Sequence, residues 1–191
     1  MENKFNLSDK PNMKLLDLGC GNRKYPGAIG IDNNPNTEAD IIHDLNSIPY
    51  PFEDSSFDEI IADNVLEHLD NPLKVMEEIH RISKNDAKVV IAVPYFRSFY
   101  ATIDPTHKNY FGVWWFKYFD PSHPFYKRYG YTETQFRSDK LEFDREFKIG
   151  KMSLHHKLLV MFAEKYPYSY EARISHLLPL NSLTFYLKAV K

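Results

Sequence analysis

The chain contains seven short apolar runs separated by loops and amphipathic stretches, and this spacing restricts the folds open to it. The first five runs are continuous or nearly so, which is typical of strands covered on both faces rather than of a half-exposed sheet. The runs span residues 15–18, 28–31, 41–43, 59–62, 88–93, 141–149 and 182–190. The pattern predicts an open α/β fold with a mostly parallel sheet.

One amphipathic helix is expected between the fourth and fifth runs. Asn71 suits the N-cap position and Pro72 the first helical turn, and the helix is predicted to end near Lys84. Its apolar stripe consists of Leu73, Met76, Ile79 and Ile82. Such a stripe packs one face of a helix against a core.

Length and composition favour a single globular domain, residues 1–191, with a small-molecule partner. A chain of 191 residues with 43% hydrophobic content can bury a sizeable core, and a formal charge of −2 argues against a nucleic-acid binder. The polar N-terminus has no apolar signal region, and no apolar run approaches the roughly 18 residues of a membrane span, so a cytoplasmic protein is expected. The single cysteine, Cys20, excludes an internal disulfide and is expected to pack within a turn.

Aromatic residues concentrate in one segment after the fifth run. Residues 95–131 contain 15 of the 29 aromatic side chains, and three prolines within them argue against one long helix. Two interpretations stay open: a satellite core that packs a long excursion onto the domain, or a substrate lid over residues 95–139, because ligands of open α/β sheets bind beyond the carboxyl ends of the strands. A second insertion, residues 151–180, is predicted to be helical and precedes the last strand.

The segment LLDLGCGNRKYPGAIGID, residues 15–32, predicts a ligand site at the end of the first strand. Gly19 and Gly21 let the backbone approach a ligand closely, because glycine has no Cβ and tolerates positive φ. Asp32, at the end of the second strand, can accept hydrogen bonds from ribose hydroxyls. Dinucleotides and S-adenosylmethionine are both bound by such an arrangement, so the turn alone leaves both cofactor classes open.

Two residues favour S-adenosylmethionine. The dinucleotide fingerprint needs a third glycine where this chain has Lys24, whose side chain would enter the close contact between helix and strand. Asp17 lies within the first strand, and a buried carboxylate there needs a cationic or hydrogen-bonding partner, which a ligand ammonium group would supply. Further polar residues follow the third and fourth strands and are expected to face the same crevice: Asp44, Asp63, Asn64, Glu67 and His68.

The segment from about Lys14 to Val93 resembles class I S-adenosylmethionine-dependent methyltransferases of the broad methyltransferase-domain group. The stretches LLDLGCG, IGID, LNSIPYPFEDSSFDEIIADNVLEHLDNP and KVMEEIHRI match this family in order and spacing, and the elements GCGxxKxPGxxGxD and DPTH are similar to those of one subgroup. The resemblance implies the Rossmann-like class I methyltransferase fold, with a seven-stranded sheet and helices on both faces. It also implies S-adenosyl-L-methionine as the cofactor.

Matching positions carry the expected cofactor contacts. The resemblance implies that Asp17 and the two glycines face the methionine part, Asp32 the ribose, and Asp44 with Leu45 the adenine. The full set of cofactor residues expected in this way is Asp17, Gly19, Cys20, Gly21, Asp32, Asn33, Asp44, Leu45, Asn64 and Leu66.

The Asp-Pro-Thr-His element supplies the candidate base. Methyl transfer to a hydroxyl needs a group that takes the hydroxyl proton, and the pKa of histidine suits this task. His107 is predicted as this base with Asp104 as its orienting partner. A structural role of His107 is the alternative, and Tyr95 or Glu67 is then the next candidate. Asp104 and His107 alone do not make a metal site and no third ligand is visible, so no bound metal is predicted.

The predicted function is methyl transfer from S-adenosylmethionine to a small-molecule acceptor, namely a hydroxyl of a sugar or a related metabolite. Two alternatives stay open: N-methylation of an amine or amino-sugar, and a non-catalytic cofactor-binding module that acts through protein contacts. His155 and His156 are interpreted as solvated or packed side chains. Lys127, Arg128 and Arg97 are interpreted as solvated charges, with binding of a substrate phosphate or carboxylate as the alternative.

Overall fold

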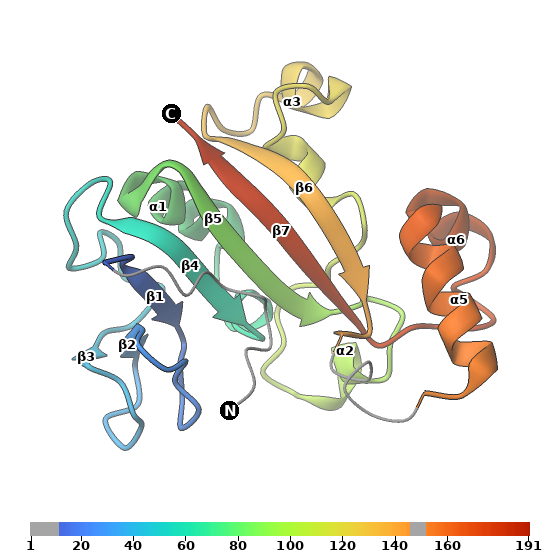
Figure 1. Ribbon diagram of the computed structural model, residues 1–191, viewed down its shortest axis with the longest axis horizontal. Coiled ribbons are helices and arrows are strands. Elements are labelled where there is room, and N and C mark those ends of the chain that lie inside the picture. Colours follow the sequence, from blue (N-terminus) through green and yellow to red (C-terminus); the bar gives the residue numbers. More distant parts are fainter. Residues whose placement is uncertain (1–11, 146–151) are drawn as a thin grey trace.

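The computed structural model of the chain describes residues 12–145 and 152–191. Seven strands form one sheet in the order β3-β2-β1-β4-β5-β7-β6 (Figure 1). The first five strands pair in parallel, and β7 runs antiparallel to both of its neighbours. The strands are β1 (Leu15–Leu18), β2 (Ile29–Asp32), β3 (Ile41–Ile42), β4 (Phe57–Asp63), β5 (Ser83–Pro94), β6 (Gln135–Phe143) and β7 (Ser182–Val190). The predicted seven-stranded, mostly parallel sheet is confirmed.

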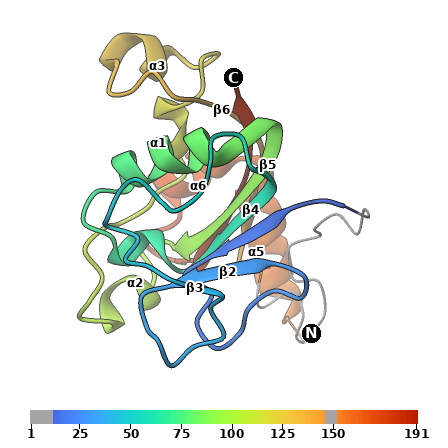
Figure 2. The ribbon, with the colours of Figure 1, turned by 90° about the vertical axis from the view of Figure 1, so that its left-hand side faces the viewer.

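Helices flank this sheet (Figures 1 and 2). The α-helices are α1 (Pro72–Ile82), α2 (Tyr100–Ile103), α3 (Pro124–Tyr129), α5 (Leu154–Lys165) and α6 (Pro167–Arg173), and the 3₁₀ turns are η1 (Leu66–His68) and η2 (Trp115–Tyr118). The predicted insertion at residues 151–180 thus contains two helices, α5 and α6. In the described part of the chain, no helix has the length and apolar character needed to cross a membrane.

The helix α1 forms where the sequence predicts it. The side chain of Asn71 accepts a hydrogen bond from the backbone N–H of Lys74, and Pro72 occupies the first turn, where its missing N–H costs nothing. Met76, Ile79 and Ile82 are fully buried in the main core. The helix ends at Ile82 rather than near Lys84, because β5 begins directly at Ser83 and pairs with β4 there.

The central strands are buried on both faces, which explains their continuous apolar runs. Val89, Ile91 and Val93 of β5 belong to the main core, whereas Val90 and Ala92 point to the opposite face and join a smaller cluster. Successive side chains of a strand alternate between faces, so both sets must be apolar.

The strand β6 begins earlier in the chain than the predicted run at 141–149. It spans Gln135–Phe143 because it pairs along its whole length with β7, and Phe136 and Phe143 both enter the main core. Of the predicted run, residues 146–149 lie outside the described residues.

The aromatic segment runs from one end of the sheet to the other. It leaves β5 at the carboxyl end, forms α2 there, and reaches the start of β6, where Gln135 pairs with Val190 at the opposite end. Figures 1 and 2 show α2 and α3 at these two opposite ends. Phe111, Phe116 and Phe119 are buried in the main core on the way. Much of the segment therefore packs the domain together, as the core interpretation expects.

Candidate active site

The glycine turn follows β1 at the carboxyl end of the sheet. Gly19 and Gly21 have φ angles of +63° and +52°, in the left-handed region that glycine tolerates. A Cβ at Gly19 would lie 2.6 Å from a methyl carbon of Val65, the residue two positions after β4. The turn is held by hydrogen bonds from Gly19 N to the Ile31 carbonyl at 2.8 Å and from Gly21 N to Asp32 Oδ2 at 3.0 Å. The chain therefore needs glycine at position 19 for both conformation and space.

Lys24 stands where a dinucleotide site would have its third glycine, and the structure shows why it is accommodated. The connections between β1 and β2 (residues 19–28) and between β2 and β3 (residues 33–40) contain no helix, so no close contact between helix and strand exists there. The Lys24 stem instead crosses Gly30, where a Cβ would meet it at 2.5 Å. Its ammonium group pairs with Asp40, which also accepts the Gly30 N–H at 2.7 Å.

Asp17 is buried in β1, with 3% of its surface exposed. Its Oδ2 accepts a hydrogen bond from the Tyr25 N–H at 2.9 Å. Burial is the main reason that its pKa rises to about 6, partly opposed by this hydrogen bond. A cation bound beside Asp17 would favour the charged carboxylate and relieve this penalty.

Asp32, at the end of β2, has a double role. Its Oδ2 holds the glycine turn through Gly21 N, and its Oδ1 accepts the Asn34 N–H at 2.9 Å. It is half-buried, and the adjacent Asn33 is exposed at the same edge of the sheet. A carboxylate has about four acceptor sites in all, so Asp32 keeps acceptor capacity for a ligand.

Asp44 and Leu45 follow β3, the next strand outward. The backbone N–H of His43 bonds to the Asp32 carbonyl, which keeps this connection beside the end of β2. Asp44 is exposed and accepts hydrogen bonds from the backbone and side chain of Asn46. Leu45 is buried, and its carbonyl accepts the Tyr50 hydroxyl.

Asn64 and Leu66 follow β4 on the other side of β1. Asn64 is exposed and has a φ angle of +56°, a conformation that is uncommon for a residue with a Cβ and is over-represented at functional sites. Its side-chain amide donates to Asp63 Oδ1. Leu66 is fully buried in the main core. The order β3-β2-β1-β4 thus aligns the predicted cofactor residues along one edge of the sheet (Figure 1).

Cys20 lies inside the turn with 7% of its surface exposed. Burial, followed by the nearby charges of Asp17 and Asp32, raises the pKa of its thiol to about 11. The thiolate needed for nucleophilic chemistry is therefore scarce near neutral pH, and Cys20 acts as a packing residue.

Glu67, His68 and His107 meet next to the end of β4. Each offers one ligand atom, and these atoms all lie within 4.8 Å of one another. The two imidazole rings are in edge contact, with centroids 4.7 Å apart. Glu67 is 1% exposed, and burial raises its pKa to about 8. Burial is also the main factor that lowers the pKa of His68, followed by the charge of His107.

Two backbone hydrogen bonds bring the loop that carries His107 onto η1. The N–H groups of Lys108 and Asn109 both donate to the Glu67 carbonyl, at 2.7 and 3.1 Å. The Asn109 amide also donates to the Leu69 carbonyl at 2.6 Å. Residues 40 positions apart are in this way joined into one cluster.

The hydrogen-bond partners of His107 and Asp104 differ from the predicted pair. His107 Nδ1 lies 3.1 Å from the Ala101 carbonyl, whereas Asp104 Oδ1 accepts from the backbone N–H and the hydroxyl of Thr106. These two bonds lower the pKa of Asp104. The Thr106 hydroxyl lies 2.9 Å from His68 Nδ1, so the Asp104 carboxylate is connected to the ring of His68 rather than to the ring of His107.

Tyr95 is fully buried. Its ring lies in edge contact with Phe96 and Phe143, and burial raises the pKa of its hydroxyl. A buried phenol with a raised pKa is rarely ionised near neutral pH and is a weak base.

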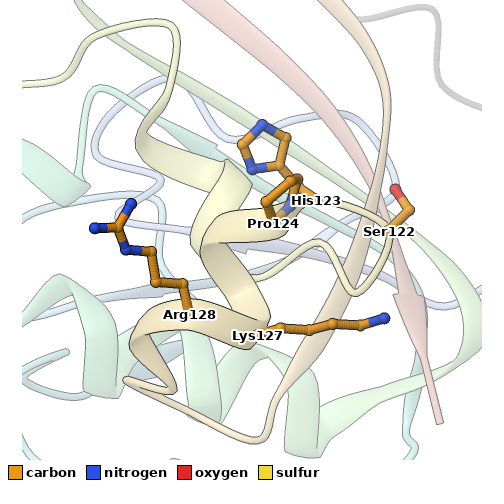
Figure 3. A pocket seen from close by; sticks show the side chains of 5 residues that line it. All are labelled: Ser122, His123, Pro124, Lys127 and Arg128. Atoms are coloured by element: carbon orange, nitrogen blue, oxygen red, sulfur yellow. The ribbon is translucent and has the colours of Figure 1, made fainter.

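Lys127 and Arg128 lie on α3, at the other end of the sheet from this cluster (Figures 1 and 2). A surface hollow lies beside α3 (Figure 3). It is lined by Ser122, His123, Pro124, Lys127 and Arg128. Figure 3 shows the charged ends of Lys127 and Arg128 pointing to different sides, so they do not converge on one anion. Arg97 is exposed and lies over the Phe96 ring.

The histidine pair of α5 matches its packed or solvated interpretation. His156 Nε2 bonds to the buried carboxylate of Asp144 at 2.8 Å, and His155 is exposed. Sequence reasoning did not join Glu67 and His68 with His107. The available signal was that Glu67-His68 and the Asp-Pro-Thr-His element follow adjacent strands, β4 and β5, of a parallel sheet.

Comparisons with known proteins bear on the family and the fold of the chain. The model of the family described as "Methyltransferase domain" matches residues 3–137, more than half of the chain. The uncharacterized protein MJ0638 of Methanocaldococcus jannaschii is 46% identical over an alignment of 101 positions, and the match covers 46% of this chain and 43% of that protein. The chain thus matches less than half the length of this curated relative.

Solved structures share the fold at low identity. A complex of the Haloferax volcanii Trm112 methyltransferase activator and a putative methyltransferase matches with a TM-score of 0.58 and 18% identity, over 94% of this chain and 83% of that chain. A Haemonchus contortus N-methyltransferase, solved with phosphomonomethylethanolamine and S-adenosylhomocysteine, matches with a TM-score of 0.55 and 16% identity, over 98% of this chain and 50% of that chain. The chain therefore belongs to the methyltransferase domain family.

Proposed function

We propose that this chain transfers the methyl group of S-adenosylmethionine to a hydroxyl of a small molecule, a sugar or a related metabolite. The observation that carries the proposal is the position of the cluster of Glu67, His68 and His107 directly beside the row of predicted cofactor residues. A donor bound over the end of β1 would have its methyl group close to this cluster. Class I methyltransferases of this fold use that edge of the sheet, where ligands of open α/β sheets bind.

The cofactor contacts are part of this proposal. Asp17 pairs with the ammonium group of the methionine part, and the backbone of the glycine turn approaches it closely. Asp32 accepts hydrogen bonds from the ribose hydroxyls, and Asp44 with Leu45 lies at the adenine. The side chain of Leu66 is fully buried, so only its backbone is assigned to the cofactor.

The acceptor hydroxyl lies against Nε2 of His107. In the reaction the acceptor oxygen forms a bond to the methyl carbon, the bond from carbon to sulfur breaks, and its electron pair stays on sulfur to give S-adenosylhomocysteine. The hydroxyl proton must leave in the same step or before it. His107 acts on this proton either as a base or through a cation that Nε2 ligates, and a variant without this nitrogen loses turnover in both cases.

We restrict the proposed lid, predicted from the sequence as residues 95–139, to the part of the aromatic segment at the carboxyl end of the sheet. Residues 96–110 include α2 and carry the exposed aromatic side chains Phe99, Tyr100 and Tyr110. Closure of these residues over the acceptor would exclude water from the sulfonium. Hydrogen exchange in residues 96–110 is expected to slow when cofactor and acceptor are both bound, and unchanged exchange would exclude a lid.

The test of the function is conversion of S-adenosylmethionine to S-adenosylhomocysteine with panels of acceptors. Sugars and related polyols are expected to raise turnover above the rate with water. Turnover only with amines or amino-sugars would replace the proposal by N-methylation. Tight cofactor binding without turnover on any panel, together with capture of a protein partner, would favour the non-catalytic module.

A further inference from the structure

We infer that Glu67, His68 and His107 form a binding site for one divalent transition-metal ion at the carboxyl end of β4. The three side chains bring together one carboxylate oxygen and two imidazole nitrogens, all within 4.8 Å of one another. They come from the 3₁₀ turn η1 and from the Asp-Pro-Thr-His loop, which two backbone hydrogen bonds to the Glu67 carbonyl hold together. Sequence reasoning predicts no metal here because it lacks a third ligand; the fold supplies Glu67 and His68 as further ligands.

Glu67 is the group that most needs a partner. Its side chain is 1% exposed, and neither carboxylate oxygen has a hydrogen-bond partner among the residues that the structure describes. A buried carboxyl group without a hydrogen-bond partner is unfavourable in either protonation state, and buried carboxylates in proteins are generally paired or coordinate a metal. An ion held between Glu67 and the two histidines would remove this cost.

In both histidines the hydrogen bond is made by Nδ1, and Nε2 of each ring is available to bind a metal. His107 Nδ1 faces the Ala101 carbonyl at 3.1 Å, which can only accept, so this nitrogen carries the hydrogen. His68 Nδ1 faces the Thr106 hydroxyl at 2.9 Å, and that hydroxyl donates its single hydrogen to Asp104 Oδ1 at 2.7 Å.

His68 Nδ1 is therefore also the donor in its contact. Both rings are left with an unprotonated Nε2, the atom with which neutral imidazole binds metals. Metal-bound histidines almost always donate their other N–H to a carbonyl, a carboxylate or water, and the Ala101 carbonyl and the Thr106–Asp104 pair provide this orientation.

The ligand types select the ion. Imidazole suits Zn²⁺, Fe²⁺, Ni²⁺ and Cu²⁺, whereas Mg²⁺ prefers oxygen ligands throughout. Two ligands of one ion lie roughly 3–3.5 Å apart when each is about 2.0–2.2 Å from it, so the side chains move by about 1 Å as they close on the ion. His68 and His107 are both partly exposed, which leaves their rings room for this adjustment and keeps the ion open to solvent on one side.

The role of the ion rests on the proposed function. Three protein ligands leave at least one position for a water or for the acceptor hydroxyl, as in catalytic metal sites. A bound hydroxyl loses its proton to solvent more easily, and its oxygen then takes the methyl group while S-adenosylhomocysteine leaves. His107 then acts as a ligand, and the ion lowers the pKa of the acceptor in place of a base.

Metal binding is tested on the tag-free full chain without cofactor, so its outcome is independent of methyl transfer. Metal-stripped protein is titrated with Zn²⁺ and Mg²⁺ by calorimetry and with Co²⁺ by visible absorption. One equivalent of Zn²⁺ or Co²⁺ is expected to bind, with Mg²⁺ at least about 100-fold weaker. Glu67→Gln and His107→Gln are each expected to weaken Zn²⁺ binding by more than the roughly 10–100-fold that loss of an outer partner costs. His155→Gln, an exposed histidine on α5, is the matched control and should bind as the parent does.

The stability of the metal-free Glu67→Gln variant excludes misfolding as the explanation. It should unfold at about the same temperature as metal-free parent, because glutamine has nearly the same shape as glutamate and the described residues offer neither side chain a hydrogen-bond partner at this position. Zn²⁺ should raise the unfolding temperature of the parent only. Absence of Zn²⁺ binding, or binding unchanged in Glu67→Gln and His107→Gln, would overturn the site even in an active methyltransferase. Full turnover of the metal-stripped parent would overturn the catalytic role of the ion and leave His107 as the base.

Discussion

The two halves of the candidate site are built in different ways. The glycine turn of the cofactor half is held by a near neighbour in the sequence: Asp32 Oδ2 accepts a hydrogen bond from the N–H of Gly21, only 11 residues away. The acceptor half joins Glu67 with His107 across 40 positions, through hydrogen bonds to the Glu67 carbonyl. The cofactor can therefore be inferred from a local motif, whereas the chemistry at the acceptor depends on how the connection between β5 and β6 packs against η1.

The largest effect should come from the acceptor half. His107→Gln removes Nε2, the atom assigned to the acceptor proton or the ion, and turnover should fall by about 10²–10⁴-fold. Cofactor affinity should change little, because the ring lies outside the cofactor row. Steady-state kinetics and calorimetry on the same preparation check both statements, with His155→Gln as the control. Near-normal turnover in a folded variant would show that His107 is a structural residue and that this ring does not act on the acceptor.

Asp32→Ala should have the next largest effect, and on affinity rather than on turnover at saturation. Loss of a charge-assisted hydrogen-bond pair to the ribose costs about 1.5–3 kcal/mol, which is about ten-fold or more in affinity. The variant also loses the contact to Gly21 N, so the turn itself loosens. Calorimetry with S-adenosylmethionine and S-adenosylhomocysteine measures the loss. Binding of both ligands at parent affinity would contradict the ribose assignment.

Alanine substitutions at Gly19 and Gly21 should distinguish the cost of a positive φ from the cost of a steric clash. Gly19→Ala forces a positive φ and places a Cβ 2.6 Å from Val65, whereas Gly21→Ala has the same type of φ but nothing within 4 Å. We expect Gly21→Ala to cost about 1 kcal/mol of unfolding free energy and Gly19→Ala about 2–3 kcal/mol. Chemical denaturation measures both. Equal losses of unfolding free energy would mean that the Val65 side chain moves aside and that a Cβ at Gly19 causes no steric clash.

The smallest effect is a pH dependence of cofactor binding. Asp17 has a pKa of about 6 in the protein, so it is mostly charged at pH 7 and mostly neutral at pH 5. Only the charged form pairs with the ligand ammonium group, so affinity should fall about ten-fold from pH 7 to pH 5. Calorimetry across this range measures the fall, and Asp17→Asn should show a flatter profile with weaker binding at pH 7. The same slope in Asp17→Asn would assign the titration to another group.

Much of the fold was predictable because its signals are local. The continuous apolar runs follow from strands buried on both faces, as Val89 and Val90 of β5 show by entering different clusters. The cap at Asn71 and the stripe through Ile79 predict α1 almost to the residue. The ends of β6 were not predictable, because its start at Gln135 is set by pairing with β7 and not by its own pattern.

The role of Lys24 shows where a local rule fails. The rule that a third glycine must stand there assumes a helix after the turn, and this chain has a loop there whose space is provided by Gly30. The pairing of His107 with Asp104 failed for a related reason. Three residues of separation permit the contact, but the Thr106 hydroxyl competes for the carboxylate and the Ala101 carbonyl takes the imidazole N–H.

The strand pattern, the glycine turn and the carboxylates of the cofactor edge can be predicted without a structure, because these depend on residues that are close in the chain and on backbone conformations that few residue types allow. Only the tertiary structure decided that Glu67 and His68 share a cluster with His107. The Lys108 N–H donates to the Glu67 carbonyl in a connection whose Phe111 is buried in the main core. Such a contact depends on the packing of the whole connection, and no spacing within one segment encodes it.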